Sequence, residues 1–226
     1  DALNRVEGLH WIRMLYAYPE RITPELLDAV ERNEKVLPYF DIPIQHINDD
    51  ILRSMHRKGD GQIIRNAIRM IREKLPDAML RTSLIAGYPG ETEAQFEELC
   101  AFVKEAKFDR LGCFAYSQEE GTEAAGLPNQ LPEEVRRHRA DVIMELQSHI
   151  MEQKQQAMVG REIEVLCDGY DEEQSFWLCR GMGDAPEIDA NVLVDGDAAL
   201  EPGTFYQVKI TGAAVYDLYG ELVNPV

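Results

Sequence analysis

The sequence lacks the C-x-x-C spacing that zinc and redox sites use, since its four cysteines lie at positions 100, 113, 167 and 179. We expect these cysteines to be reduced and buried as small apolar residues. No apolar run approaches the roughly 20 residues of a membrane-spanning helix, and the first residues do not form a signal peptide. Neither a catalytic triad nor a catalytic pair of carboxylates is identifiable. These absences predict a cytoplasmic chain and leave the metal ligands and the catalytic residues unassigned.

Positive charge is also scarce, because 23 lysines and arginines face 41 acidic residues and give a net charge of −18. Such a balance argues against indiscriminate nucleic-acid binding, which needs local lysine and arginine, and it favours a basic partner. The deficit is largest from Gly160 onward, where three basic residues face fourteen acidic ones. That segment is therefore poorly suited to RNA, although it contains aromatic residues of the kind that stack on bases.

Two patterns of alternation divide the chain into two domains. Apolar runs predicted as strands at 9–18, 39–44, 80–87 and 110–116 alternate with amphipathic helices, which is typical of a parallel α/β sheet. A long helix from Pro132 to about Ala157 follows. Five short runs then predict a small five-stranded barrel, at 162–167, 176–180, 191–194, 205–211 and 215–219. We place the domain boundary near Val159, which gives domains 1–159 and 160–226.

The stretch Leu80–Thr92 has the most informative pattern in the first domain. A strand ends at Gly87, the chain turns at Pro89-Gly90, and an amphipathic helix begins after Thr92. Thr92 and Gln95 have the spacing of a capping box. Such a turn presents free backbone N–H groups to a ligand, or it simply makes a tight connection between strand and helix.

Polar and aromatic residues follow each of the four predicted strands. Because ligands of parallel α/β domains bind at the carboxyl ends of the strands, these residues together predict the rim of a site. Any one of them alone is an ordinary loop residue, and a lone histidine is more often structural than a base. The rim residues are Tyr18, Glu20, Gln45, His46, Tyr88, Glu91, Tyr116, Ser117 and Glu119.

A row of arginines lies on the predicted helix before Pro76. Arg65, Arg69 and Arg72 have i, i+4 and i+7 spacing, which puts them on one helix face. One interpretation is a solvated outer face. The other is a phosphate-binding patch for contact with the ribosome or another RNA.

Several motifs in order resemble the radical S-adenosylmethionine methylthiotransferases. They are Tyr16–Glu20, Asp41–His46, Ile85–Thr92 and Tyr116–Thr122, followed by a long helix and a TRAM-like barrel. The resemblance covers essentially the whole chain. It implies a partial parallel (β/α) barrel of the radical-SAM type followed by a TRAM domain.

Two subfamilies fit this resemblance. Members that modify adenosine in tRNA usually have a Ser-Gly-Ser run after the glutamine and a basic TRAM domain. This sequence instead has Gln45–Asp49 and an acidic barrel. It is therefore more similar to the members that methylthiolate an aspartate of small-subunit ribosomal protein S-twelve, a basic partner that the acidic TRAM domain would bind.

The resemblance also implies cofactors and a mechanism. In the complete enzyme one 4Fe–4S cluster cleaves S-adenosylmethionine, the resulting radical removes a hydrogen from the aspartate β-carbon, and a second 4Fe–4S cluster supplies sulfur. The family's cluster-binding cysteine motifs are not found in this sequence, so we expect a C-terminal portion of a longer enzyme, inactive alone. A non-catalytic module that binds a basic ribosomal protein is the alternative. The motifs assign S-adenosylmethionine to Gln45, His46, Gly87, Tyr88, Pro89, Gly90, Glu91 and Tyr116.

Overall fold

The computed structural model describes residues 1–223. Two compact units make up the chain, Asp1–Gln147 and Ser148–Val226. The division falls inside helix α5 (Glu133–Gln156), whereas the boundary expected from the sequence near Val159 lies after that helix. Within the described part, no helix is both long enough and apolar enough to cross a membrane.

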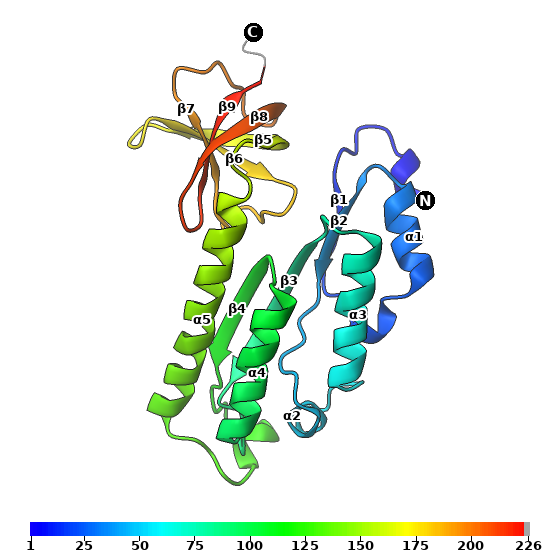
Figure 1. Cartoon of the computed structure of the whole chain (residues 1–226), viewed down its shortest axis with the longest axis vertical. Helices are drawn as coiled ribbons and strands as arrows, with labels where there is room; N and C mark the ends of the chain where they lie inside the picture. Colours follow the sequence, from blue (N-terminus) through cyan, green and yellow to red (C-terminus); the bar gives the residue numbers. More distant parts are fainter. Residues whose placement is uncertain (224–226) are drawn as a thin grey trace. The chain divides into compact units, whose positions relative to one another are not determined.

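The first unit is built on a four-stranded, all-parallel sheet (Figure 1). Its strands in spatial order are β1 (Ile12–Met14), β2 (Val36–Asp41), β3 (Met79–Ala86) and β4 (Arg110–Ala115). Three helices lie against one face of this sheet in Figure 1: α1 (Pro24–Arg32), α3 (Gly61–Lys74) and α4 (Glu93–Ala106). This arrangement confirms the predicted α/β class.

Burial along β3 alternates with every residue. Leu80, Thr82, Leu84 and Ala86 are buried, whereas the residues between them keep some exposure. Parallel strands that are covered on both faces lose this alternation. The helices therefore bury one face of the sheet, and the other face remains partly open to solvent.

Local capping explains where the helices begin. Thr23 accepts a hydrogen bond from the Leu26 amide at the start of α1, and Asn48 caps the short helix α2 (Asp49–Ser54) in the same way. Thr92 and Gln95 form the complete capping box that their spacing predicts at the start of α4. These caps satisfy amides that have no partner inside the helix.

The first two strands differ from their predicted ranges. The predicted strand 9–18 is wrong in length, because β1 holds only three residues and Tyr16 turns the backbone to a φ of 57°. The predicted strand 39–44 begins too late and ends too late. β2 starts at Val36 and stops at Asp41, before Pro43 would remove a donor from the ladder.

The second unit contains a closed barrel in the order β5-β6-β7-β9-β8. The five predicted strands are present, as β5 (Glu162–Asp171), β6 (Phe176–Gly181), β7 (Val192–Asp195), β8 (Phe205–Ala213) and β9 (Leu218–Leu222). Only the last was misplaced by several residues, because Ala214 and Asp217 close a turn where the predicted strand 215–219 begins. The described core is aliphatic and also holds Cys167 and Cys179. Among residues 1–223, the remaining short elements are 3₁₀ turns at Leu3–Arg5, Pro19–Arg21 and Ala124–Gly126.

Candidate functional site

The carboxyl ends of β2 and β3 are joined through Gln45. The Gln45 amide donates to the Ser83 carbonyl, and the Ile85 amide donates to the Gln45 carbonyl, both at 2.9 Å. These bonds make an isolated parallel bridge between Gln45 and Leu84. The predicted rim residues Gln45 and His46 are thus held beside the turn that follows β3.

A pocket of about 400 Å³ opens at this edge of the sheet. Its volume lies within the usual range for small-molecule sites. Two predicted residues, Gln45 and Tyr88, line it. The sequence interpretation missed the others, which come from the end of α2, from β3 and from the loop after β4: Ser54, Met55, His56, Arg57, Ile85, Glu123 and Ala124.

Two residues that line this pocket have strained backbones. Gln45 has a φ of 69° and His56 a φ of 54°, in the left-handed region that side chains other than glycine rarely adopt. Strain of this kind costs roughly 1–3 kcal/mol and collects at functional sites, where the surrounding structure enforces it. At Gln45 the enforcement comes from the two backbone bonds to β3.

Behind the pocket lies a buried polar cluster centred on the Glu91 carboxylate, which has no exposed side-chain surface. Both of its oxygens lie 3.1 Å from the Gly87 amide, and the Arg139 guanidinium donates to one of them at 2.7 Å. His46 Nε2 is 3.3 Å from the other oxygen, without the geometry of a hydrogen bond. His46 Nδ1 accepts from the Asn48 amide at 3.0 Å, so the ring proton lies on Nε2, facing Glu91.

Most backbone amides of the turn between Gly87 and Thr92 are bonded inside the protein, which corrects an expectation from the sequence. Four of them already donate to acceptors of the first unit, so they are not available to an incoming anion. The four pairs, at 2.9–3.1 Å, are Gly87 with the Glu91 carboxylate, Gly90 with the Asn129 carbonyl, Glu91 with the Tyr88 carbonyl and Thr92 with the Gln95 side chain.

The two predicted tyrosines differ in position. Tyr88 lines the pocket and donates from its hydroxyl to the Ser54 carbonyl at 3.1 Å. Tyr116 is not among the pocket-lining residues and packs edge-on against Tyr88, with ring centroids 5.4 Å apart. Burial raises the pKa of the Tyr116 hydroxyl, so it stays protonated at neutral pH. Tyr116 therefore contacts a lining residue without lining the pocket itself.

The other predicted residues lie at the margin of the site. Pro89 is buried and Gly90 is partly exposed. Tyr18 lies under the guanidinium of Arg57, a lining residue, at 5.5 Å. The Ser117 hydroxyl donates to the Glu119 carboxylate at 2.6 Å, and both residues are exposed.

Comparison with known proteins shows which families and relatives this chain is similar to. Residues 4–103 match the Radical SAM superfamily, and residues 159–223 match the TRAM domain. Three curated relatives share the name ribosomal protein uS12 methylthiotransferase RimO. They are 45% identical over 98% of this chain in Bdellovibrio bacteriovorus, 47% over 98% in Desulfitobacterium hafniense and 46% over 97% in Aquifex aeolicus.

The chain is similar to the RimO-type radical SAM proteins along almost all of its length. It spans about half the length of the curated relatives, 49%, 50% and 51% respectively. The resemblance read from the sequence motifs is thereby confirmed, including the TRAM domain and the choice of the ribosomal-protein subfamily.

The cysteines of this chain do not fit an iron–sulfur cluster, which needs several thiolates in one place. Cys100 and Cys113 belong to the first unit, whereas Cys167 and Cys179 are buried in the barrel. Burial raises the pKa of Cys113 to about 12, which keeps its thiol protonated. Among residues 1–223, no group of three or more histidine, cysteine or acidic side chains is arranged to hold a metal.

The arginine row of α3 has partners within the first unit. Arg65 pairs with Glu105, Arg69 with Glu73 and Arg72 with Asp109. Arg72 also donates to the carbonyls of Ala78 and Lys107. Each positive charge therefore lies beside a carboxylate, which agrees with an outer helix face; contact with the ribosome through these arginines stays a prediction.

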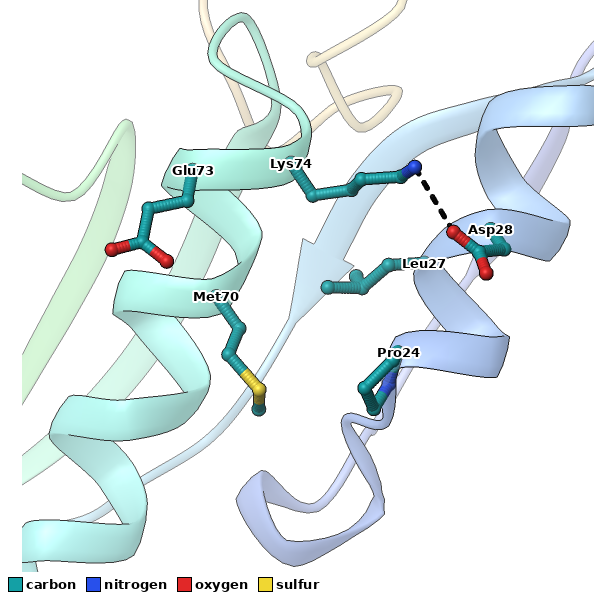
Figure 2. Close-up of a pocket in the computed structure, with 6 residues that line it drawn as sticks. All are labelled: Pro24, Leu27, Asp28, Met70, Glu73 and Lys74. Atoms are coloured by element: carbon teal, nitrogen blue, oxygen red, sulfur yellow. Dashed lines mark ion pairs between the residues drawn. The ribbon is translucent and has the colours of Figure 1, made fainter.

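A second pocket of about 300 Å³ lies between α1 and α3 (Figure 2). None of the residues predicted for the site lines this pocket. Its lining consists of Pro24, Leu27, Asp28, Met70, Glu73 and Lys74. The Lys74 ammonium pairs with Asp28 at 3.0 Å, as Figure 2 shows, and also with Glu31. Its position between two covering helices, rather than at the carboxyl ends of strands, separates it from the candidate site.

Proposed function

We propose that this chain supplies the cofactor pocket and the partner-binding barrel of an enzyme that transfers a methylthio group to the β-carbon of an aspartate in ribosomal protein uS12. The observation that carries the proposal is the 45–47% identity to three RimO proteins over almost all of the chain. Because the chain matches only half of those relatives, the activity is proposed for the full-length enzyme. The reaction would take place in the cytoplasm.

The pocket at the edge of β2 and β3 fits the nucleoside part of S-adenosylmethionine. Ile85 and Tyr88 offer apolar and aromatic surface, and the side-chain amide of Gln45 can donate and accept hydrogen bonds. The internally bonded amides of the turn leave no cradle for a phosphate, and a nucleoside without phosphate does not need one. Bound here, S-adenosylmethionine would supply the radical and the methyl group of the reaction.

The protein's own residues have three tasks in this proposal. Tyr88 and Gln45 contact the nucleoside and orient it. Gly87, Pro89, Gly90 and Glu91 hold the turn, and His46 anchors the chain next to Gln45. Tyr116 keeps water from the back of Tyr88. The 4Fe–4S clusters that the family implies would take their ligands from outside these residues, so no step at a cluster is assigned to this chain.

Mass spectrometry of uS12 tests the proposal. Deleting the full-length gene should remove the methylthio mass from the target aspartate, and a plasmid copy should restore it. An aspartate whose mass is unchanged by the deletion would refute the proposal. Nucleoside analysis of tRNA from the same cells is the companion measurement, because loss of a methylthiolated adenosine would instead identify a tRNA-modifying enzyme.

We further propose that the barrel contributes to uS12 binding through its negative charge. Cations are few there, and Arg180 is held by Asp168 with both carboxylate oxygens within 3.0 Å. An aromatic ring that could stack on RNA bases is already used, since Trp177 packs against Tyr170 at 5.0 Å and donates to the Ala198 carbonyl. A basic polypeptide suits this surface better than RNA does.

Charge reversal tests the role of the barrel. Glu172 and Glu173 are exposed in the turn between β5 and β6, and their replacement by lysine should weaken uS12 binding to the full-length protein about fivefold, at roughly 0.5 kcal/mol per surface charge. Binding should also weaken as salt rises. The matched control reverses the exposed Glu7 and Glu34 of the first unit. Equal affinities of the two double variants would contradict the assignment.

A further inference from the structure

Arg139 on helix α5 holds the turn after β3 at three points. It donates to the Glu91 carbonyl at 2.9 Å and to the Glu91 carboxylate at 2.7 Å, and its other terminal nitrogen pairs with Glu93 at 2.9 Å. The guanidinium also lies over the Phe96 ring at 5.1 Å. Only 7% of this side chain is exposed, so the contacts are those of a packed group.

The Glu91 carboxylate connects Arg139 to residues that neighbour two lining residues of the pocket. On one side it binds the Gly87 amide, and Gly87 directly precedes Tyr88. On the other side it faces His46, which directly follows Gln45. Tyr88 and Gln45 line the pocket, whereas Arg139 does not. Arg139 therefore acts on the pocket through the backbone neighbours of its lining residues.

A second arginine of the same helix, one turn earlier, supports the same geometry. Arg136 donates to the Tyr116 carbonyl at 2.6 Å, and its guanidinium lies 5.8 Å from the Tyr116 ring centroid. Its Cα, Cβ and Cγ lie so close to Gly87 that only a glycine fits there. Helix α5, rather than the sheet alone, thus fixes where the ends of β3 and β4 lie.

We infer that Arg139 is a positioning residue for the cofactor: through Glu91 it sets the relative placement of Tyr88 and Gln45 on the two sides of the pocket. The inference rests on the proposed function, because it takes S-adenosylmethionine as the ligand. A group that only stabilised the fold would affect melting without affecting the affinity of the folded protein. A positioning group affects the affinity itself.

The test measures S-adenosylmethionine binding by calorimetry and melting temperature in parallel, with the full-length protein carrying its clusters. Arg139→Gln should weaken binding at least about tenfold, in line with the usual effect of groups that orient a ligand's contacts. Arg139→Lys keeps the charge but loses the planar fork, so its affinity should lie between those of Arg139→Gln and the wild type. The control is Arg137→Gln, since Arg137 is exposed, pairs with Glu133 and makes none of these contacts.

A double variant keeps the inference testable if Arg139→Gln folds poorly. Glu91→Gln with Arg139→Gln removes both buried charges together, and it should recover melting temperature while binding stays weak. The inference is overturned if a folded Arg139→Gln protein binds with wild-type affinity, or if affinity recovers with melting temperature in the double variant. Failure of the wild-type protein itself to bind would instead refute the proposed cofactor, and with it the inference.

Discussion

Replacing Gly87 by alanine is expected to destabilise the first unit by about 2–5 kcal/mol and to weaken cofactor binding. Gly87 has a φ of 75°, where an L-residue costs roughly 1–2 kcal/mol. An added Cβ would also lie 2.5 Å from the Arg136 Cγ and 2.8 Å from its Cα. Overpacking of this kind adds roughly 1–3 kcal/mol, and here it cannot be relieved by a rotamer change because one of the atoms belongs to the backbone of α5.

Gly90 provides the matched control for this substitution. It has a similar φ of 81°, but a Cβ built there meets no atom within 4 Å. Gly90→Ala should therefore show the conformational cost alone, about 1–2 kcal/mol. Urea unfolding followed by the helical circular dichroism signal measures both, since the barrel strands contribute little to it. Equal losses for the two alanine variants would mean that contact with α5 does not constrain Gly87.

Features set by neighbours in the sequence could be predicted from it. The caps Thr23, Asn48 and Thr92 act on amides two or three residues away. Such local bonds depend little on the rest of the fold, which is why the predicted helix starts agree with the structure. The barrel strands could be predicted for a related reason, because inward and outward positions alternate with a period of two.

Features that depend on distant contacts were harder to predict. Gly87 has the pattern of a glycine that lets a ligand approach, yet the group that excludes a side chain there is Arg136, from a helix far along the chain. Arg139 belongs to the run Arg-Arg-His-Arg, which has the composition of a solvated helix face, and only packing reveals that it is buried.

Some residues that line the pocket could be predicted from their neighbours in the sequence, and others could not. Its predicted residues, Gln45 and Tyr88, directly follow the strand ranges 39–44 and 80–87 that were expected from the sequence. His56 and Glu123 come from segments without a strong pattern, and their side chains meet in a hydrogen bond of 3.0 Å. The end of α2 could have been considered from its position after Gln45, since a short helix that is capped by Asn48 must end near the same edge of the sheet.

The buried cluster also changes the role expected for the predicted site residues His46 and Glu91. Both were predicted beside the nucleoside, but His46 has no exposed surface and Glu91 only 3%. The polar groups of an interior must be paired, because an unpaired buried charge costs several kcal/mol. Neither side chain lines the pocket: the Glu91 carboxylate is bonded to Gly87 and Arg139, and His46 Nδ1 accepts from the Asn48 amide.

Removing the Glu91 carboxylate is accordingly expected to have a second large effect. Glu91→Ala should destabilise the first unit by roughly 3–5 kcal/mol, because Arg139 then remains buried without its main charge partner. The Gly87 amide loses its acceptor as well. Amide hydrogen exchange on β3 and α4 should become faster, while exchange in the barrel serves as the internal reference.

Glu93 is the matched control, since it pairs with the same arginine at 2.9 Å but is 70% exposed. Solvent screens that pair, so Glu93→Ala should cost at most about 1 kcal/mol. A loss of the same size in both variants would show that the number of arginine contacts, and not burial, determines the effect. A large loss at Glu91 alone would make the buried carboxylate the group that joins α5 to the turn, because Glu93 contacts the same guanidinium without bonding to Gly87.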